Sequence, residues 1–391
     1  MRKYFLFSAL FFSVVLSMNF KNCRSQTTST PIELVNSISL TNISGRLGHM
    51  AYNNKQQVVY LAALSNNTME IIDLQNKKTI RSIKSLRQPI DVEYIPNVDI
   101  VFVACLGDGL CRAFNANNFK EEISLRFDNN VSIVRFSPTF QMLYVGYGDG
   151  SIAVVDANTF KLKTTIKVPV HPEAIFLDEN SSKMFVNLPK SREISVIDLK
   201  DNTVKKSFNL SDAAENYPIA YDKKNKRLFI GCRKPSTLLI VDSENGNKKS
   251  SIDIDGDVNE IFYDEARKQL YVTCGDGYLN IIKQEVKEVK ELINQPTKQT
   301  SNPPKGKTST KIQTKKTTSK QTPKQTAPKS KSTTSPPQYR TITKDTYETI
   351  SRTYTGNGAR TSLFIPELNQ IIVAVPAFAD KDAKLAIYQL K

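Results

Sequence analysis

The stretch that decides the fold is VSIVRFSPTFQMLYVGYGDGSIAVVDANTFKLKTTIKV, residues 131–168. It predicts four short strands, at residues 131–136, 142–146, 151–156 and 162–168. Pro138 ends the first strand, because proline cannot donate a hydrogen bond to a sheet ladder. Residues 148–150 read Gly-Asp-Gly, and these glycines can take the positive φ angles that a tight hairpin requires. The apolar run at residues 152–155 indicates a strand that is covered on both faces.

This unit recurs along the chain at a nearly constant spacing. Each copy carries one large apolar or aromatic marker residue in its first strand: Tyr52, Tyr94, Phe136, Leu177, Tyr221, Tyr263 and Phe364. The first six markers are 41 to 44 residues apart, and seven residues after each marker an apolar residue opens the second strand: Val59, Val101, Leu143, Met184, Leu228, Leu270 and Ile371. A period of this size with about four strands is typical of a propeller blade. We therefore predict an all-β fold, a single seven-bladed β-propeller with four-stranded antiparallel blades, over residues 26–391.

The third strands end in a carboxylate or an amide, at Asp73, Asn115, Asp156, Asp198 and Asp242. Such a side chain accepts a hydrogen bond from the backbone two residues ahead and so begins a turn. We interpret these residues as turn formers rather than as catalytic acids.

The repeat spacing also reveals an insertion and a strand without a blade of its own. Tyr263 and Phe364 are 101 residues apart, and the excess over one period falls between a third strand at residues 278–282 and a fourth at 347–353. The seventh copy stops after a third strand at residues 385–390, whereas residues 33–40 form a strand before the first copy. Pairing these two strands closes the ring and removes an open sheet edge.

Together, these features resemble the YVTN-type propeller repeats of exported YncE-like proteins. The resemblance rests on the second strand Leu143-Tyr144-Val145, the Gly-Asp-Gly hairpin and the third strands that end in Val-Ile-Asp or similar. It covers residues 32–391 without the insertion, and it implies a fold rather than a particular activity. WD-repeat propellers are a poorer match, since the chain has no Trp.

The N-terminus has the pattern of a secretory signal. Met1-Arg2-Lys3 is a charged start, and residues 4–16 form a short apolar run. We expect a signal peptide over residues 1–17, or to 22 or 25, and an exported protein in the periplasm, at the cell surface or outside the cell. Cys23 follows closely enough to be a candidate for lipidation, although residues 20–22 are a poor lipobox.

The net charge of +16 belongs mainly to the insertion. Residues 294–344 contain twelve Lys or Arg and no acidic residue, while the rest of the chain has 42 basic and 38 acidic residues. This segment is too polar to bury a core, and we expect it to be disordered. It reads either as a solvated linker or as an attachment site for an anionic polymer or lipid. The segment lacks the aromatic platforms on which bases stack, so nucleic acid is not the expected partner. Just before it, the spacing of Val286, Val289 and Ile293 predicts a short helical stub.

The cysteines offer one pair for an oxidising compartment. Cys105 and Cys111 flank the hairpin at residues 106–110, and they would face each other if Leu106 faced Leu110. A directly cross-strand disulfide is strained, so reduced thiols are the alternative. Cys232 and Cys274 lie at the same place in later units and read as small core residues. There is no CxxC motif, which leaves haem attachment and a thioredoxin-type site without support.

The starts of the first strands line the central channel of a propeller, where a ligand site is most common. The polar residues expected there are Arg46, His49, Ser132, His171, Glu173, Tyr217, Asn259, Glu260 and Arg360. A small polar or anionic ligand could lie among Arg46, His49, His171 and Arg360. The alternative is a polar wall that only faces water.

Metal binding has little support in the sequence. Two histidines cannot build a three-His site. Asp253, Asp255 and Asp257 alternate as in a calcium loop, but Val258 stands where such a loop requires glycine. We expect no metal and no cofactor.

Three function classes remain open. The first is a monomeric, non-catalytic scaffold that binds a protein or another component of the cell envelope. It is favoured because the sequence shows no constellation of residues typical of an active site. The second is a hydrolase of the lactonase type, with His171, Glu173 and Arg360 as candidate catalytic residues. The third is a quinone or copper redox propeller, which the scarcity of histidines disfavours. Convergence of His171, Glu173 and Arg360 within hydrogen-bond reach would favour the hydrolase.

Overall fold

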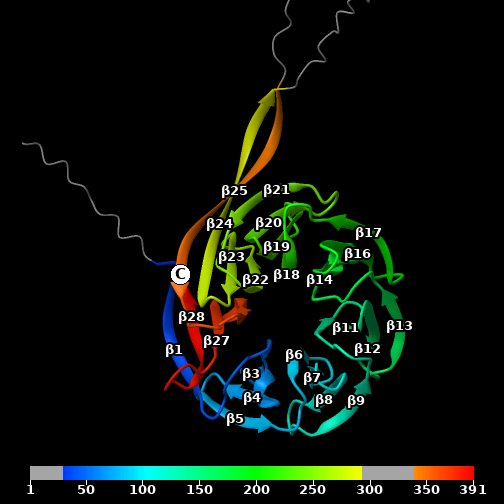
Figure 1. Ribbon diagram of the computed structural model, residues 1–391, viewed down its shortest axis with the longest axis vertical. Helices are drawn as coiled ribbons and strands as arrows, with labels where there is room; N and C mark the ends of the chain where they lie inside the picture. The colour runs from blue at the N-terminus through cyan, green and yellow to red at the C-terminus, as the bar shows by residue number, and fades with distance from the viewer. Residues whose placement is uncertain (1–29, 293–338) are drawn as a thin grey trace, which may run out of the picture.

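The computed structural model describes residues 30–292 and 339–391. Within these residues the strands form seven four-stranded antiparallel sheets, arranged as a ring of blades around a central opening (Figure 1). The predicted seven-bladed propeller is therefore confirmed. In the first six blades the strands follow chain order from the channel to the rim, and in the seventh the order is β26, β27, β28 and β1.

The blades have these bounds. Blade 1 consists of β2 (Met50–Asn53), β3 (Val58–Ala63), β4 (Thr68–Asp73) and β5 (Lys78–Ile83). Blade 2 consists of β6 (Pro89–Ile95), β7 (Ile100–Cys105), β8 (Leu110–Asn115) and β9 (Glu121–Arg126). Blade 3 consists of β10 (Ile133–Ser137), β11 (Met142–Tyr147), β12 (Ser151–Asp156) and β13 (Leu162–Lys167). Blade 4 consists of β14 (Ala174–Asp178), β15 (Lys183–Leu188), β16 (Glu193–Asp198) and β17 (Thr203–Asn209). Blade 5 consists of β18 (Ala214–Asp222), β19 (Arg227–Lys234), β20 (Ser236–Asp242) and β21 (Lys248–Asp253). Blade 6 consists of β22 (Val258–Asp264), β23 (Gln269–Cys274), β24 (Tyr278–Leu292) and β25 (Tyr339–Tyr354). Blade 7 consists of β26 (Thr361–Ile365), β27 (Gln370–Val375), β28 (Ala383–Leu390) and β1 (Ile32–Leu40). Three short 3-10 turns are η1 (Leu64–Asn66), η2 (Glu179–Ser181) and η3 (Pro366–Leu368).

The marker residues form the same cross-strand pair in every blade. Each marker in a first strand lies directly opposite the apolar residue seven positions later: Tyr52 opposite Val59, Tyr94 opposite Val101, Phe136 opposite Leu143, Leu177 opposite Met184, Tyr221 opposite Leu228, Tyr263 opposite Leu270, and Phe364 opposite Ile371. The second-strand member of each pair is fully buried. The hydrophobic core therefore lies between neighbouring blades, with the second and third strands at its centre.

The predicted turn formers cap the turns after the third strands. Asp156 accepts hydrogen bonds from the backbone of Asn158 at 3.1 Å and Thr159 at 2.9 Å. Asn115 does the same for the backbone of Asn117 at 3.0 Å. These contacts, led by that to the Thr159 backbone, lower the pKa of Asp156 to about 2. The side chains are therefore occupied in turns, as the sequence predicted.

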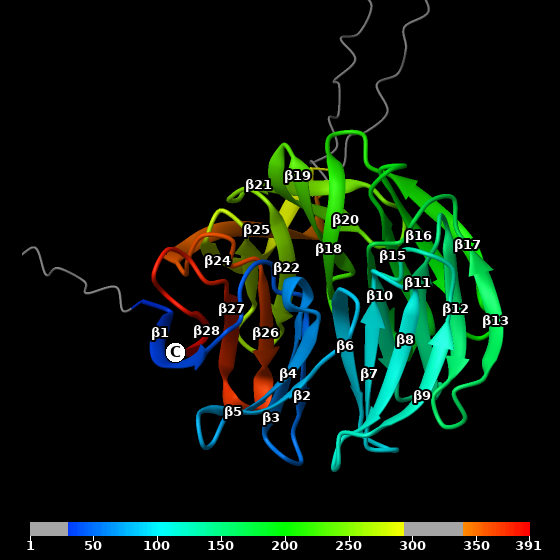
Figure 2. The same cartoon turned by 60° about the horizontal axis from the view of Figure 1, so that its bottom comes forward.

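The ring closes through the two ends of the described chain. β1 pairs antiparallel with β28 from Ile32 opposite Leu390 to Leu40 opposite Ala383, with a bulge between Leu34 and Asn36. Figures 1 and 2 both show β1 beside β28 at the rim of the ring. The buried residues Ile32, Ile38 and Leu40 join the core of this region. The predicted closure is thus confirmed.

Blade 6 departs from the predicted pattern. The predicted helical stub at residues 284–293 is wrong as far as Leu292, because β24 continues through these residues and pairs with β25 up to Leu292 opposite Tyr339. The partner strand contains Tyr, Thr and Ile at 339–343, residues that favour strands, and cross-strand pairing outweighs the helical propensity of Glu and Lys. For the same reason residues 339–344 form strand, so the predicted disordered segment is too long at this end. Residues 293–338 lie outside the described residues.

A buried polar network fixes the base of this long ribbon, which projects beyond the ring in Figure 1. The Gln284 amide donates to Asp222 at 2.9 Å and accepts from the Tyr263 hydroxyl at 2.6 Å. Arg227 of blade 5 donates to Asp345 at 2.6 Å. The ribbon is therefore attached to blade 5 as well as to its own blade.

The possible Cys105–Cys111 disulfide does not form, and both residues are free cysteines. Cys105 lies opposite Leu110, and Cys111 lies opposite Ala104. This register is shifted by one residue from the one that a disulfide needs, and a shift of one residue sends a side chain to the other face of the sheet. The two thiols accordingly belong to different core clusters on either side of blade 2. Cys232 and Cys274 are fully buried, as expected of core residues.

The expected signal peptide and Cys23 lie outside the described residues. Among the described residues, no helix is long and apolar enough to cross a membrane.

Candidate functional site

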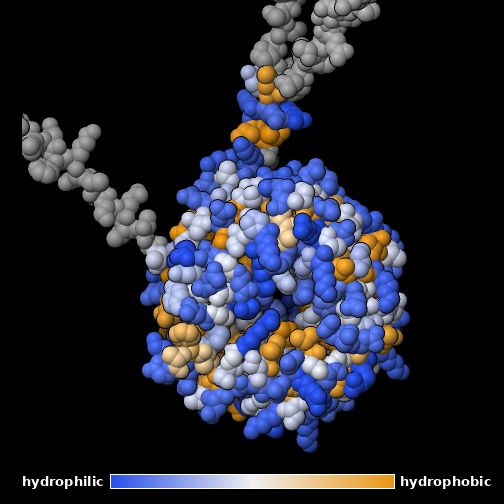
Figure 3. All heavy atoms as spheres, in the orientation of Figure 1, coloured by the Kyte–Doolittle hydropathy of each residue, from blue (hydrophilic) through white to orange (hydrophobic). Residues whose placement is uncertain are grey.

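The central channel contains a cavity of about 620 Å³. Figure 3 shows the opening as a hollow at the centre of the ring, with hydrophilic residues around part of its rim. All nine polar residues that the sequence placed in the channel line this cavity: Arg46, His49, Ser132, His171, Glu173, Tyr217, Asn259, Glu260 and Arg360. Residues far apart in the chain are therefore brought to one place.

Equivalent backbone positions deliver five of these side chains. Ser132, Glu173, Tyr217, Asn259 and Arg360 each lie four residues before the marker of their blade. Because the blades are arranged radially, equivalent positions meet around the axis. The repeat thus positions one different functional group from each of five consecutive blades.

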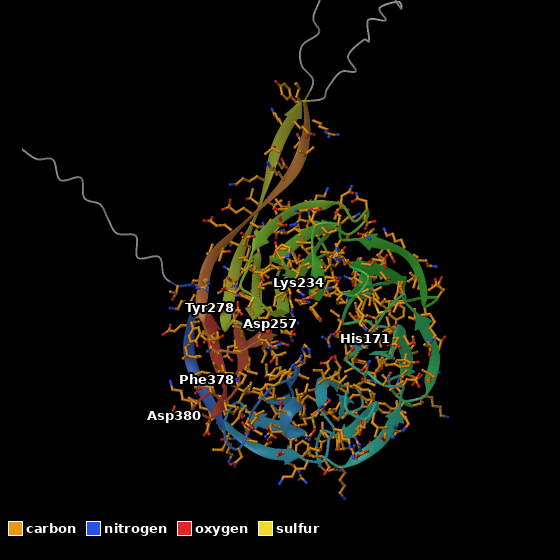
Figure 4. The ribbon with its side chains drawn as sticks, viewed as in Figure 1. His171, Lys234, Asp257, Tyr278, Phe378 and Asp380 are labelled. Carbon is orange, nitrogen blue, oxygen red and sulfur yellow. The ribbon has the colours of Figure 1, made fainter. Side chains whose placement is uncertain are left out.

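Two arginines at the cavity share one carboxylate. Asp257 pairs with Arg233 at 3.2 Å and with Arg360 at 2.7 Å. Arg233 also donates to the backbone carbonyl of Val258 at 3.0 Å and to the Asn259 side chain at 3.1 Å, and its guanidinium lies 3.9 Å from the centre of the Tyr217 ring. Figure 4 shows Asp257 across the central opening from His171.

The sequence pattern did not identify Arg233 and Asp257 as site residues. It pointed only to the starts of first strands, whereas Arg233 lies near the end of a second strand, in β19, and Asp257 belongs to an acidic loop between blades. Arg233 directly follows Cys232, which occupies the same blade position as Cys105 and Cys274. This repeated position is the signal that could have identified Arg233.

Arg46 lines the cavity without a protein partner among the described residues. Within the described residues, its guanidinium makes no ion pair and no side-chain hydrogen bond. It keeps a large exposed surface at the mouth of the cavity, yet the surrounding protein lowers its pKa by burial, and the positive charges of Arg360 and Arg233 lower it further. Lys190 also lines the cavity without a partner among these residues. The site therefore contains positive charge that the described protein does not neutralise.

His49 does not contribute a free charge, contrary to the expected anion site. Its Nδ1 atom is in close contact with the Glu260 carboxylate. Burial opposes protonation, but Glu260 and Asp91 outweigh it and raise the pKa of His49. His49 and Glu260 therefore form an internal pair.

A second charged group lies beside this pair. Arg135 donates to Asp91 at 2.8 Å, and Asp91 also accepts from the backbone of Val134 at 2.9 Å. Next to them, burial raises the pKa of Glu93 to about 7, although Arg135 opposes this shift. Glu93 is thus an acid that the fold holds partly protonated near neutral pH.

The three candidate catalytic residues do not converge. The Nδ1 atom of His171 contacts the carbonyl of Gly148 at 2.5 Å, which requires a proton on Nδ1. Arg360 is bound to Asp257. Burial raises the pKa of Glu173, whose carboxylate has no hydrogen bond or ion pair from a side chain in residues 30–292 and 339–391. No hydrogen bond in this part of the chain joins any two of the three residues.

The acidic loop at residues 253–257 binds arginines. Asp255 accepts from Arg352 at 2.6 Å, and the guanidinium of Arg352 lies 3.4 Å from the centre of the Tyr278 ring. Asp257 holds Arg233 and Arg360, as described above. Among the described residues no group of three or more His, Cys, Asp or Glu side chains is placed to hold a metal ion.

The cavity also has an apolar wall. Its members come from blades 2 to 7 and include the aromatic side chains of Phe176, Tyr221, Phe262, Tyr263 and Phe364. A cavity of this size with an apolar wall and a few polar groups is suited to a small organic molecule.

Comparison with known proteins supports the fold more strongly than any function. No family model matches the chain. The YncE proteins of Salmonella typhi and Salmonella typhimurium (strain LT2) are each 26% identical over 157 residues, which is 39% of this chain and 44% of those proteins. The chain thus matches less than half the length of these curated relatives.

Two solved structures share the architecture. A chain of the mitotic checkpoint complex superposes with a TM-score of 0.64 at 12% identity, covering 98% of this chain and 99% of that one. Hydrazine synthase of Kuenenia stuttgartiensis superposes with a TM-score of 0.61 at 13% identity, covering 86% of this chain and 95% of that one. At these identities the likeness shows the propeller fold alone.

Proposed function

We propose that this protein is an exported, non-catalytic binding protein of the YncE-like propeller class, and that its channel cavity binds a small acidic ligand. The single observation that carries this proposal is the unneutralised positive charge at the cavity. Arg46 and Lys190 have no partner among the described residues, and Arg233 and Arg360 share the one carboxylate of Asp257. An acidic ligand would supply the missing acceptors, with charge-assisted hydrogen bonds.

The arrangement of the candidate catalytic residues favours binding over turnover. A general base must be oriented toward the group that it deprotonates, and the nucleophile and its activating partner must be within reach of each other. His171 contacts a backbone carbonyl and Arg360 an aspartate, so neither orients Glu173. The lactonase-type hydrolase is therefore the weaker candidate.

Isothermal titration calorimetry with citrate, succinate and inorganic phosphate tests whether the cavity binds an acidic ligand. We expect at least one of these anions to bind, and Arg46→Ala and Arg360→Ala each to weaken it by about 1 to 3 kcal/mol, the cost of losing a charge-assisted hydrogen bond. Arg81→Ala on the exposed strand β5 is the matched control and should bind normally. Unchanged affinity in the Arg46 variant would refute the proposed site.

The non-catalytic claim has a separate test. Purified protein should not hydrolyse a panel of lactones above the rate of the buffer. Hydrolysis that is lost in Glu173→Gln or His171→Ala, with the melting temperature unchanged, would overturn the binding-protein proposal and establish the hydrolase.

The cellular setting belongs to the same proposal. The charged start and apolar run of residues 1–17 support export, and the basic composition of residues 294–338 supports attachment to an anionic polymer or lipid of the cell envelope. Expression in a bacterium, followed by fractionation and N-terminal sequencing, tests export, and Cys23→Ser tests whether membrane association depends on lipidation. A full-length protein retained in the cytoplasm would contradict this part.

A further inference from the structure

The charged groups of the cavity divide into those that the protein pairs and those that it leaves without a partner. Asp257 pairs with Arg233 and Arg360, and Glu260 contacts His49. Among the described residues that line the cavity, three charged side chains remain without an ion pair: the cations of Arg46 and Lys190 and the carboxylate of Glu173.

Arg46 and Glu173 belong to one site but do not satisfy each other. Both side chains line the same cavity, and the positive charges of His171, Arg233 and Arg46 oppose the rise in the pKa of Glu173 that burial causes. They are nevertheless too far apart to form an ion pair. A ligand that fills this cavity can therefore contact both.

The chemistry of the two residues defines that group. A guanidinium only donates hydrogen bonds and prefers a carboxylate, whereas an ionised carboxylate only accepts and prefers an ammonium group or another donor. A purely anionic ligand would bind Arg46 but would bring like charge toward Glu173. A ligand with an acid and an amine on neighbouring atoms satisfies both residues.

The apolar wall extends this argument to the rest of the ligand. Phe176 and Phe262 line the same cavity, one in the blade that carries Glu173 and the other in blade 6. The volume of about 620 Å³ leaves room beyond the two charged groups for an apolar substituent.

We infer that the cavity binds a zwitterionic small molecule of the amino-acid class with an apolar side chain, its carboxylate on Arg46 and its ammonium group on Glu173. This inference rests on the proposed function, because it specifies which acidic ligand the same site takes. It adds a role for Glu173 as a residue that determines specificity.

The test measures the affinity of the full chain for three matched probes by isothermal titration calorimetry at pH 7.5. L-phenylalanine carries the acid and the amine, 3-phenylpropanoate lacks the amine, and phenethylamine lacks the acid. We expect phenylalanine to bind at least tenfold more tightly than either of the other two.

Two variants assign the roles. Glu173→Gln should remove most of the advantage of phenylalanine over 3-phenylpropanoate, and Arg46→Gln should weaken both of these acids by about tenfold, one lost charge-assisted hydrogen bond. Glu122→Gln and Arg81→Gln, at exposed positions in β9 and β5, are matched controls and should leave all affinities unchanged.

The outcomes separate the inference from the proposed function. Equal binding of phenylalanine and 3-phenylpropanoate, with both weakened in Arg46→Gln, would overturn the zwitterion and keep the acidic ligand. Binding of phenethylamine as tight as that of phenylalanine would overturn the role of the acid. If none of these probes and none of the simple anions bound, both proposals would fail.

Discussion

Two sets of equivalent positions in the blades behave in opposite ways. The residues at the second position of the second strands are all apolar and all fully buried: Val59, Val101, Leu143, Met184, Leu228, Leu270 and Ile371. The residues four positions before the markers differ in chemistry from blade to blade: Gly48, Ile90, Ser132, Glu173, Tyr217, Asn259 and Arg360. The first set holds neighbouring blades together. The second set, apart from Gly48, lines the channel cavity; at Gly48 a Cβ atom would lie 2.5 Å from the carbonyl oxygen of Ile90, so packing requires glycine there. The repeat therefore fixes the ring and leaves its channel free to specify a ligand.

The largest expected effect comes from removing the strand that closes the ring. Deleting residues 26–41 removes β1, exposes the edge of β28 and withdraws the buried side chains of Ile32, Ile38 and Leu40 from the core. At about 2 kcal/mol for each buried aliphatic side chain, the loss is about 6 kcal/mol. Thermal unfolding followed by circular dichroism should show a large fall in melting temperature. A chain that starts at Thr30 keeps β1 and is the control, and equal melting temperatures for the two would contradict closure.

A pair of substitutions in blade 3 compares the two sets directly. Leu143→Ala removes a fully buried side chain and should lower the free energy of unfolding by about 2 to 5 kcal/mol. Ser132→Ala removes one hydrogen bond to the carbonyl of Pro172 at the channel and should cost about 1 kcal/mol or less. Urea denaturation measures both values. Similar losses for the two variants would show that the channel positions are also needed for folding.

Burying an acidic side chain should also cost stability, and Glu93, whose pKa is raised by burial, provides the measurement. Folding raises its pKa to about 7, so the folded state holds the proton more tightly than the unfolded chain, in which a glutamate has a pKa of about 4.3. The stability from this group is present below about pH 4 and is lost as the pH rises through 7, a difference of about 4 kcal/mol.

Glu93→Gln removes this titration. The variant should match the wild type near pH 4.5 and should be more stable at pH 8 by up to about 4 kcal/mol. Urea denaturation over this pH range tests the difference between the two proteins. A difference that does not change with pH would mean that Glu93 is not held protonated in the folded state.

The smallest effect is expected at the insertion. Replacing residues 293–338 with Asn-Gly joins Leu292 to Tyr339, which lie opposite each other at the end of the ribbon and fit a two-residue hairpin turn. Because the network at Gln284 and Asp345 is retained, the melting temperature should change by no more than about 2 °C. A larger fall would mean that the inserted residues take part in folding. Complete amide exchange in this segment at the earliest times would agree with its predicted disorder.

The fold was predictable because it depends on a pattern that is repeated seven times. Single errors in strand ends do not disturb a spacing such as that from Leu143 to Leu228. Local register was less predictable: the hairpin after Cys105 differs by one residue from the alignment that would pair the thiols, which sends Cys105 and Cys111 to opposite faces. The strand at Gln284 was missed because its pairing partner follows the insertion, and a local helical pattern cannot reveal a distant partner.

The site was predictable in position but not in its pairing. All nine expected residues line the cavity, since the start of a first strand faces the channel in every blade. The sequence could not show that Glu260 contacts His49 or that Asp257 holds Arg360, because these partners come from different blades. Which charges remain for a ligand is decided by those contacts between blades.

The most direct test of an unneutralised charge in the channel is the position of halide ions in a crystal soaked in sodium bromide. Bromide is a small anion that anomalous scattering locates whatever the natural ligand is. We predict a bromide ion beside the Arg46 guanidinium, inside the cavity, that is absent from crystals of Arg46→Gln. Bromide ions on the outer surface alone, with none in the cavity of the wild-type protein, would contradict an anion site in the channel.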